Sequence, residues 1–400
     1  MNHLQLNDDI FPVGALDPLL RMFDVIMPTE FGTSYNSYLI RDEKITVIDG
    51  VKAPFADVWL DNIRRHVDPK SISYLILNHM EPDHTGAIPR FLEAAPQCQV
   101  VLSKVAAQYY QNLFHTSNNL IPVGDGDTLN IGKRTLKFHF LPFLHWPDSM
   151  FTWSEVDRTL FTCDVYGCHF CDERAFEGDV SDFAGAFQFY YEVIFRTWKD
   201  YVLKANVKAR ELNPAVIAPS HGPILNVNPM KYVQLYEQWS QPLCRPDDPQ
   251  KKVLVLYESS YGNTGRLAEA LAEGAQGAGA KVSLRKASDL DFMALRDEVE
   301  SAHGILLGSP TFMGDAVEPI WKALSAFCTI PAKGKKAAVF GSYGWSGEGA
   351  KMLQERLRGL KLEVLDETFR VRFTPRPEEL DGAKQFAAKF VGWLKGEPTA

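Results

Sequence analysis

The sequence predicts an α/β protein of two domains: an α/β sandwich followed by a doubly wound parallel sheet. Three observations support this: a length of 400 residues, a Pro-rich charged segment near residue 245, and different patterns of apolar runs on its two sides. At roughly 150 residues per domain, this length supports two or three hydrophobic cores. The apolar share of 46% and the charged share of 23% are ordinary for globular domains and exclude a fibrous or disordered chain.

The domain boundary is expected in residues 240–252, SQPLCRPDDPQKK. Its prolines and charges leave little to bury, and proline disfavours both a helix and a central strand. We therefore predict a first domain over residues 1–250, including a linker at about 240–251, and a second domain over residues 251–400.

In the first domain, apolar and β-branched runs are bounded by turn residues and interspersed with helical patterns. The predicted strands are residues 37–49, 73–80, 99–104, 135–142, 158–165 and 215–220. The predicted helices are residues 54–66, 86–95, 182–210 and 228–239. Many strands with helices around them predict a sandwich rather than a simple βαβ winding.

In the second domain, short apolar strands alternate with helical patterns. The predicted strands are residues 252–259, 281–287, 303–310, 336–344 and 362–371. This alternation predicts a doubly wound parallel sheet, whose ligands bind outside the carboxyl ends of the strands.

The charge balance argues against a nucleic-acid partner. The chain has 42 basic and 50 acidic side chains, a net charge of −8, and no cluster of Lys and Arg. No run approaches 18 apolar residues and no apolar leader is visible, so neither a membrane span nor a secretory signal is expected. Six cysteines are too few for a disulfide framework, so we expect a cytoplasmic protein.

Seven potential metal ligands follow predicted strands of the first domain. Four of them fall within six residues, 79–84, and the other three each close a later strand. A single histidine in such a place is more often an ordinary core or surface residue, but strand ends present convergent side chains. The seven residues are His79, Glu81, Asp83, His84, His145, Asp164 and His221.

Three loops at predicted strand ends of the second domain are rich in small and hydroxyl-bearing residues. Loop amides and the start of a helix suit a phosphate monoester, while glycines let the backbone approach a planar ring. Gly-rich turns are common, so one such loop would be weak evidence. The prediction of a site for a phosphate and a planar ring rests on the three loops together. The loops comprise Ser259, Ser260, Tyr261, Gly262, Asn263 and Thr264; Ser309, Pro310, Thr311, Phe312, Met313 and Gly314; and Ser342, Tyr343, Gly344, Trp345, Ser346 and Gly347.

Cysteine spacing offers a competing site. Cys163, Cys168 and Cys171 have the C-x4-C-x2-C spacing of plant-type ferredoxin loops without a nearby fourth cysteine. A redox-sensitive pair of Cys168 and Cys171 is a further alternative, and ordinary core or loop residues are the simplest one.

The motifs together resemble a known family. HxExDH at residues 79–84, with His, Asp and His at later strand ends, resembles the metallo-β-lactamase fold in a variant that has Glu where zinc hydrolases have His. This carboxylate hardens the donor set and favours iron. SSYGNT at residues 259–264 resembles the S-x-T-G-N-T loop of flavodoxins, with Tyr261 in place of Thr. The fusion resembles the flavodiiron proteins, or A-type flavoproteins, over essentially the whole chain.

The resemblance implies FMN in a flavodoxin-like second domain and two non-haem irons in a metallo-β-lactamase-like αββα first domain. One iron would be held by His79, Glu81 and His145, and the other by Asp83, His84 and His221, with Asp164 bridging them; in some members the residue equivalent to His84 is turned away. Tyr191 resembles the tyrosine that hydrogen-bonds the substrate, and Tyr190 competes for this role.

The resemblance also implies an oxidoreductase that reduces O2 to water or NO to N2O; the ligands do not distinguish the two gases. Its donor would be a separate redox protein, rubredoxin or a similar small carrier, and the chain would form a head-to-tail homodimer or a dimer of dimers. A zinc hydrolase with an appended flavin domain is the main alternative, which Glu81 disfavours. An electron carrier with a metal-free first domain is a third, which the seven ligands disfavour.

Overall fold

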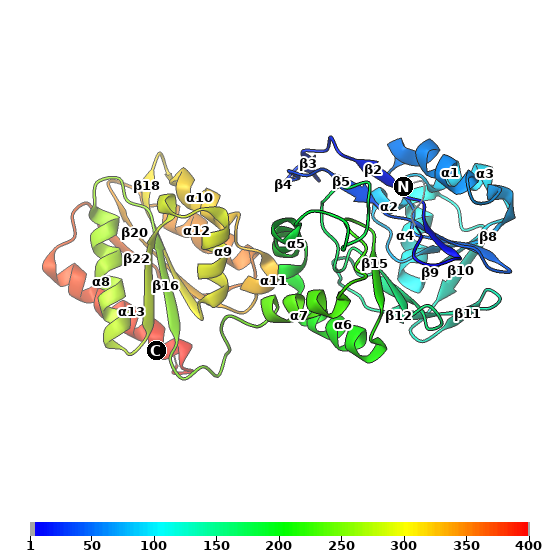
Figure 1. The fold of residues 1–400 in the computed structure, drawn as a ribbon. Helices are drawn as coiled ribbons and strands as arrows, with labels where there is room; N and C mark the ends of the chain where they lie inside the picture. The colour runs from blue at the N-terminus through cyan, green and yellow to red at the C-terminus, as the bar shows by residue number, and fades with distance from the viewer. Residues whose placement is uncertain (1–4, 399–400) are drawn as a thin grey trace. The chain divides into compact units, whose positions relative to one another are not determined.

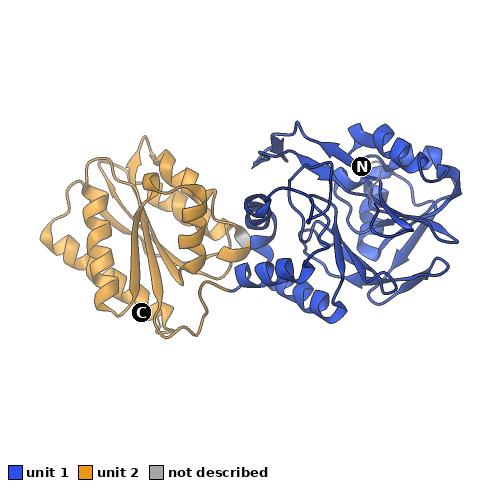
Figure 2. Ribbon diagram, in the orientation of Figure 1, with its two compact units in different colours: residues 1–241 blue, residues 242–400 orange. Residues whose placement is uncertain are grey.

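The chain forms two compact units, residues 1–241 and 242–400 (Figure 2). The computed structural model describes residues 5–398, without the side chain of Thr329. The division leaves residues 242–251 in the second unit, whereas the sequence predicts them as part of the first domain. The reason is visible in the contacts: His303 Nε2 donates to Arg245 O at 2.8 Å and Lys252 Nζ donates to Leu243 O at 3.2 Å, so the linker packs against the second unit.

The first unit is a sandwich of two mixed sheets. The six-stranded sheet has the order β1-β6-β7-β8-β9-β10, and the five-stranded sheet has the order β11-β12-β13-β14-β15. In chain order the strands are β1 Ile10–Pro12, β6 Tyr38–Ile40, β7 Ile45–Ile48, β8 Ile72–Leu77, β9 Gln99–Ser103, β10 Leu120–Val123, β11 Thr128–Asn130, β12 Thr135–Phe140, β13 Met150–Ser154, β14 Thr159–Cys163 and β15 Val216–Pro219. Two further hairpins precede β6, pairing β2 Ala15–Asp17 with β5 Thr33–Tyr35, and β3 Met22–Phe23 with β4 Met27–Pro28.

Alternating side chains build the layers of this sandwich. Ile76 of β8 belongs to the core between the sheets, while its neighbours Leu75 and Leu77 belong to the core beneath the helices, as the period of a strand requires. Figure 1 shows α1 and α3 at one side of the unit and α6 and α7 at the other. The helices are α1 Ala56–Arg64, α2 Pro82–Thr85, α3 Ile88–Ala94, α4 Lys104–Phe114, α5 Ala184–Tyr190, α6 Lys199–Leu212 and α7 Pro229–Trp239, with short 3-10 turns at Ala53–Phe55 and Pro69–Ser71.

The second unit is a doubly wound sheet with the order β17-β16-β18-β20-β21, in which β22 also pairs with β20. Helices α8 and α13 cover one face, and α9, α10 and α12 cover the other (Figure 1). The strands are β16 Lys252–Tyr257, β17 Lys281–Lys286, β18 Gly304–Phe312, β19 Asp315–Ala316, β20 Lys336–Tyr343, β21 Glu363–Val364 and β22 Phe369–Arg372. The helices are α8 Asn263–Gly277, α9 Phe292–Ser301, α10 Glu318–Leu324, α11 Thr329–Ala332, α12 Gly349–Gly359 and α13 Pro377–Leu394, with a 3-10 turn at Ala287–Asp289.

Several elements differ from the sequence prediction. The strand predicted over residues 37–49 is a hairpin of β6 and β7, because Asp42 and Glu43 lie in a turn. The strand predicted over residues 362–371 divides into β21 and β22. Helix α4 and strands β10, β11 and β13 were not predicted, although Ser103 is a helix N-cap that accepts from Ala106 N–H at 3.0 Å.

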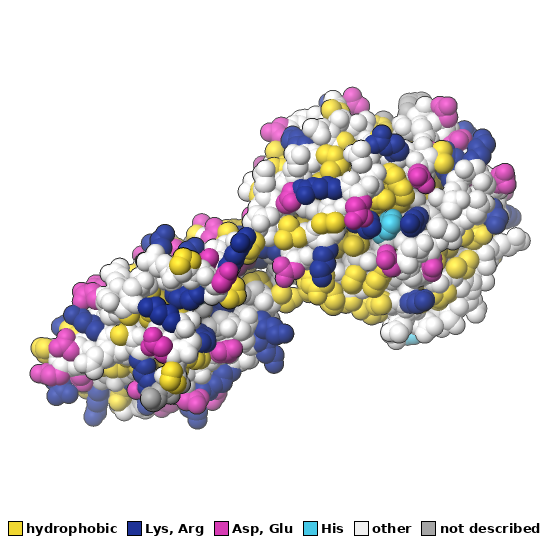
Figure 3. Space-filling view, turned by 90° about the horizontal axis from the view of Figure 1, so that it is seen from below, with side chains coloured by type: hydrophobic (Ala, Val, Ile, Leu, Met, Phe, Trp, Pro, Cys, Tyr) yellow, Lys and Arg dark blue, Asp and Glu magenta, His cyan; other side chains and the backbone are white. Residues whose placement is uncertain are grey.

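The surface carries charges of both signs. On the face drawn in Figure 3, Lys and Arg side chains alternate with Asp and Glu over both units. Within residues 5–398, no helix has the combined length and apolar character that crossing a membrane requires.

Candidate metal and flavin sites

The seven predicted ligands come together at one edge of the sandwich. His79 follows β8, Glu81 precedes α2, and Asp83 and His84 lie in α2. His145 follows β12, while Asp164 and His221 follow β14 and β15, which are parallel neighbours. Neighbouring parallel strands end at the same edge of a sheet, so the residues that follow the two strands lie close together.

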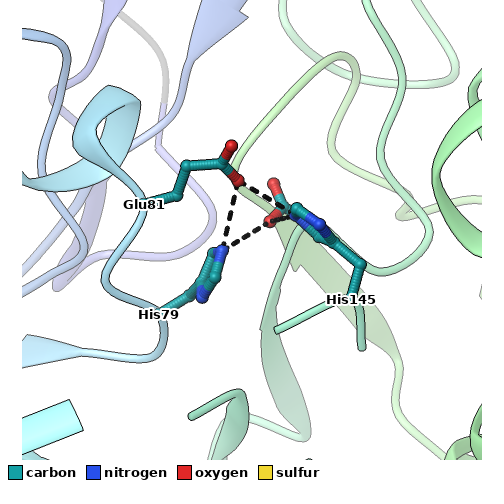
Figure 4. Close-up of side chains that lie close together, drawn as sticks. His79, Glu81 and His145 are labelled. Atoms are coloured by element: carbon teal, nitrogen blue, oxygen red, sulfur yellow. Dashed lines mark hydrogen bonds and ion pairs between the residues drawn. The ribbon is translucent and has the colours of Figure 1, made fainter. Parts of the chain in front are cut away.

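The first half of this cluster contains His79, Glu81 and His145, whose side chains point toward one another in Figure 4. Glu81 Oε2 lies 3.2 Å from His79 Nε2 and 3.0 Å from His145 Nε2. Asp164 Oδ2 lies 3.7 Å from His79 Nε2 and 3.4 Å from His145 Nε2. One ligand atom of each of these four residues therefore lies within 4.8 Å of the others.

The second half contains Asp83, His84 and His221. His221 Nε2 lies 3.0 Å from Asp83 Oδ2, and His84 Nε2 lies 3.4 Å from Asp83 Oδ1. Asp164 Oδ1 lies 3.0 Å from His84 Nε2 and 3.4 Å from His221 Nε2. The ring of His84 is thus turned toward the cluster, and Asp164 presents one oxygen to each half.

The donor set suits two cations. Both carboxylate oxygens of Asp83 and Asp164 Oδ2 are buried without a hydrogen bond of ordinary geometry, although imidazole nitrogens lie 3.0–3.7 Å away. Burial opposes charge on Asp164 and His84. The neighbouring charge of His84 nevertheless keeps the pKa of Asp164 well below its usual range, and the charges of Asp83 and Asp164 raise the pKa of His84 well above its usual value. Carboxylates and imidazoles with free lone pairs facing one centre are the donors that iron accepts.

Residues around the cluster orient the imidazoles. His79 Nδ1 lies 3.2 Å from the buried carboxylate of Asp148, which also accepts from Met80 N–H at 2.8 Å. His221 Nδ1 lies 2.6 Å from Ser34 O. A carbonyl or carboxylate oxygen accepts, so each Nδ1 is the donor and each Nε2 is left for a metal.

Two acids near the cluster were not found from the sequence. Asp148 follows the predicted ligand His145 by three residues, but no spacing indicates that it would reach His79. Asp24, in the turn between β3 and β4, hydrogen-bonds with Glu81; burial, together with the charges of Glu81 and Asp83, raises the pKa of Asp24 to about 6. Nothing in the local sequence marks this residue.

The tyrosine expected at the site is Tyr190 rather than Tyr191. Tyr190 O–H donates to Asp164 Oδ1 at 3.2 Å, whereas the Tyr191 hydroxyl pairs with Ser240 Oγ at 2.9 Å. Adjacent helical residues point about 100° apart, so only one of them can face the cluster. Helix α5 ends at Tyr190 and continues as a π-helical turn over Tyr191–Phe195. This register corrects the expected role of Tyr191.

The three closely spaced cysteines do not form a metal cluster of their own in the described part of the chain. Their sulfurs are not all within 4.8 Å of one another, and all six cysteines are free thiols. Cys163 instead groups with His84 and Asp164, beside the seven ligands. Cys168 packs against Gly222, where an added Cβ would lie 2.6 Å from its sulfur.

The three predicted flavin loops lie at the carboxyl ends of β16, β18 and β20, which are parallel neighbours. The first loop follows β16, whereas residues 309–312 of the second lie in β18 and residues 342–343 of the third lie in β20. The hydroxyl oxygens of Thr264 and Ser342 lie 2.8 Å apart, which joins the first loop to the third. Ser259 Oγ accepts from Gly265 N–H at 3.2 Å, and Gly262, with φ +83°, precedes α8. The positive end of α8 and these hydroxyls together suit a phosphate.

The second and third loops line one small cavity formed by Thr311, Met313, Gly314, Tyr343, Gly344, Trp345, Ser346 and Gly347. Met313 and Trp345 are 85% and 80% exposed, and Tyr261 of the first loop is 92% exposed. Pro310 and Phe312 do not line this cavity, although they lie in the second loop. The aromatic and glycine-rich walls suit a planar ring.

Comparisons with known proteins agree with this arrangement. Residues 33–222 match the model of the ODP family beta lactamase, and residues 255–386 match the flavodoxin model. A metallo-β-lactamase-like sandwich with a clustered carboxylate and imidazole site, joined to a flavodoxin domain, defines a flavoprotein oxidoreductase.

Full-length relatives identify the family. The chain is 40% identical to a type A flavoprotein of Rhodobacter capsulatus, over 96% of this chain and 90% of the relative. It is 39% identical to a flavo-diiron protein of Clostridium acetobutylicum, over 98% and 99% of the two chains. A solved structure of rubredoxin oxygen:oxidoreductase from Desulfovibrio gigas superimposes with a TM-score of 0.73 at 30% identity, covering 98% of each chain. The chain belongs to the flavodiiron proteins, oxidoreductases with a flavin and a non-haem diiron site.

Proposed function

We propose that this flavodiiron oxidoreductase passes electrons from a separate redox protein through FMN in the second unit to two irons in the first unit. The substrate is O2, reduced to water, or NO, reduced to N2O. The proposal rests above all on Asp164, whose two oxygens face the two halves of a buried ligand cluster.

The ligand assignment follows from the two halves. His79, Glu81 and His145 would hold one iron, Asp83, His84 and His221 the other, and Asp164 would bridge them. Bound iron would supply electrons and stabilise the charge of the reduced gas. Glu81 favours iron over zinc because a carboxylate replaces an imidazole, and the full-length relatives do not favour a zinc hydrolase.

Tyr190 is the residue that we assign to the substrate side of the cluster. Burial, reinforced by the nearby carboxylates, raises the pKa of Tyr190 well above its usual range, so the hydroxyl keeps its proton. Its oxygen lies 3.2 Å from Asp164 Oδ1, where it can donate to a ligand held between the two halves. Asp148 keeps the His79 ring in place during this reaction.

The FMN phosphate would bind to the loop of residues 259–264 at the start of α8. Thr264 and Ser342, whose hydroxyls already meet, would support the phosphate end. The cavity that contains Gly344, Trp345 and Gly347 would hold the ring. Glycine is required at residue 347, because φ is +78° there and an added Cβ would lie 3.0 Å from the Tyr343 ring.

The names of relatives support the two gases and the type of donor. A relative from Moorella thermoacetica, 32% identical over 96% of this chain and 97% of the relative, is named nitric oxide reductase. The Desulfovibrio gigas structure is named for rubredoxin and oxygen. We infer that rubredoxin or a similar small redox protein reduces this chain. We also infer that the protein acts in the cytoplasm, because free thiols such as its six cysteines persist there.

The test is turnover of the reduced protein with O2 and NO side by side, with a small electron carrier as donor. The proposal requires reduction of at least one gas at rates that depend on the carrier. Equal turnover with NADH alone would contradict the need for a separate donor, and hydrolase activity without gas reduction would contradict the proposal as a whole.

We further infer a head-to-tail homodimer, alone or as a dimer of dimers, that brings the flavin of one chain to the irons of the other. A two-fold interface would create two such junctions at once. The test mixes Asp164→Ala with a variant altered at Asn263 and Thr264. Mixed dimers should regain activity through one complete pair of sites, whereas inactivity after verified subunit exchange, or full activity of a verified monomer, would contradict the inference.

A further inference from the structure

Cys244 and Lys335 meet at a place that neither candidate site uses. Lys335 Nζ donates to Cys244 Sγ at 3.5 Å, between residues 91 positions apart in the chain. Cys244 lies in the linker segment, and Lys335 directly precedes β20. A thiol and an amine from distant segments thus lie within reach of each other.

Both groups are held by the same two carbonyl oxygens at the carboxyl end of α9. Lys335 Nζ lies 2.5 Å from Ala302 O and 3.0 Å from Glu300 O. Cys244 Sγ lies 3.3 Å from Glu300 O and 3.6 Å from Ala302 O. Because both side chains contact the same two acceptors, four contacts keep them close together in addition to the direct contact between Cys244 Sγ and Lys335 Nζ.

Cys244 is more exposed to solvent than three of the other five cysteines. Cys98, Cys163 and Cys168 are buried, and burial raises the pKa of each thiol. Cys244 is half-buried, so its residue is more open to solvent than those three. Cys171 and Cys328 are also half-buried, but within the described residues neither has a lysine nitrogen at hydrogen-bond distance.

We propose that oxidation joins Cys244 Sγ to Lys335 Nζ through a sulfur–nitrogen bond. Hydrogen peroxide is the oxidant: the sulfur attacks one peroxide oxygen, the O–O bond breaks, and a sulfenic acid and one water form. A sulfenic acid condenses with a backbone nitrogen to form a sulfenamide, and the Lys335 amine would react here in the same way. The ammonium of Lys335 releases one proton, its nitrogen attacks the sulfur, the S–O bond breaks, and a second water leaves. The thiol loses two electrons and the peroxide gains them.

The bond would tie the linker to the strand that leads into the third flavin loop. Without it, the Cys244 sulfur contacts Glu300, Ala302 and Lys335 through hydrogen bonds. With it, residues 244–335 become a closed loop that a thiol reductant reopens. The linker would therefore be covalently fixed under oxidising conditions and released under reducing ones.

The experiment uses the full-length protein with its cofactors, exposed to hydrogen peroxide and then digested without reductant for peptide mass spectrometry. We expect a cross-linked pair of peptides containing Cys244 and Lys335, lighter by two hydrogens than their sum, that dithiothreitol separates. Cys244→Ser and Lys335→Arg should abolish the pair. Lys336→Arg is the matched control and should leave it intact, because Lys336 Nζ instead donates to Trp393 O at 2.6 Å.

The protein without substitutions is sufficient to overturn the proposal, even if a variant fails to fold. Conversion of Cys244 to a sulfinic or sulfonic acid, with Lys335 still cleavable by trypsin, would contradict the link. So would an unchanged Cys244 under conditions that oxidise Cys171 or Cys328.

Discussion

The candidate metal site of the first unit is buried, whereas the candidate flavin site of the second unit is exposed. Asp164 and His221 are 2% and 1% exposed, while Tyr261 and Trp345 are 92% and 80% exposed. In the first site, charged groups are already packed against one another, so removing one leaves its partners buried without compensation. In the second, the three loops contain no Lys, Arg, Asp or Glu, so a substitution there leaves no buried charge without its partner. Substitutions should therefore act very differently at the two sites.

The largest effect is expected from Asp164→Ala. This change removes the carboxylate that faces both halves of the cluster, so metal content should fall from about two irons per chain to near zero, as elemental analysis would measure. Glu155→Ala, at an exposed turn of the same unit, is the control and should keep both metals. Two retained irons in the Asp164 variant would remove this residue from the site.

A smaller effect is expected when only the support of a ligand is changed. Asp148→Asn keeps the size of the side chain but weakens the hold on the His79 ring, so metal affinity should fall by roughly 10- to 100-fold. Competition with a chelator measures this loss. If affinity stays unchanged while the fold is intact, the orienting role of Asp148 is wrong.

The clustering of the seven proposed ligands was predictable because these residues follow strands. His145, Asp164 and His221 each stand after an apolar run, and a sheet brings such positions to one edge. Asp148 and Asp24 escaped prediction because their contacts with His79 and Glu81 join segments far apart in the chain. The choice between Tyr190 and Tyr191 depended on helix register at a π-helical turn, which composition does not reveal.

The fold was predictable to a similar degree. Strands β16, β17, β18 and β20 of the second unit stand out because each is an apolar run followed by a helical pattern. Strand β13 was missed because its sequence, MFTWS, begins two residues after Asp148 and offers little alternation. The hairpins before β6 were missed because strands of two or three residues are too short to show a period.

A modest effect is expected at the flavin site. Thr264 is 1% exposed, and Thr264→Val removes a hydroxyl that lies 2.8 Å from Ser342 Oγ. FMN affinity should therefore fall roughly fivefold, which corresponds to about 1 kcal/mol for one hydrogen bond. Tyr261→Phe alters a nearly fully exposed ring and should change affinity little. Fluorescence titration of the flavin-free protein with FMN distinguishes the two variants, and equal affinities would contradict the proposed contact.

The smallest effect concerns a buried histidine outside both sites. Burial, aided by Lys208, lowers the pKa of His139, so the folded protein disfavours its protonated form. Below about pH 6.5 the His139 side chain gains a proton in the unfolded chain, whereas the folded chain takes up this proton only at lower pH. The contribution of His139 to the free energy of unfolding is therefore fully present above about pH 6.5 and is lost as pH falls below it. His139→Asn should weaken this dependence in chemical unfolding, whereas His115→Asn, at an exposed position, should not. Equal pH dependence in both variants would contradict the assignment.

The central claim is that the buried cluster binds two irons in a protein that also binds one flavin. The most direct test is the metal and flavin content of the purified full-length protein, produced with ample iron and zinc. The account predicts about two irons and one FMN per chain, because carboxylate-rich ligands favour iron and the second unit has one phosphate loop. Zinc as the dominant metal, or a protein without flavin that still reduces O2 or NO, would contradict it.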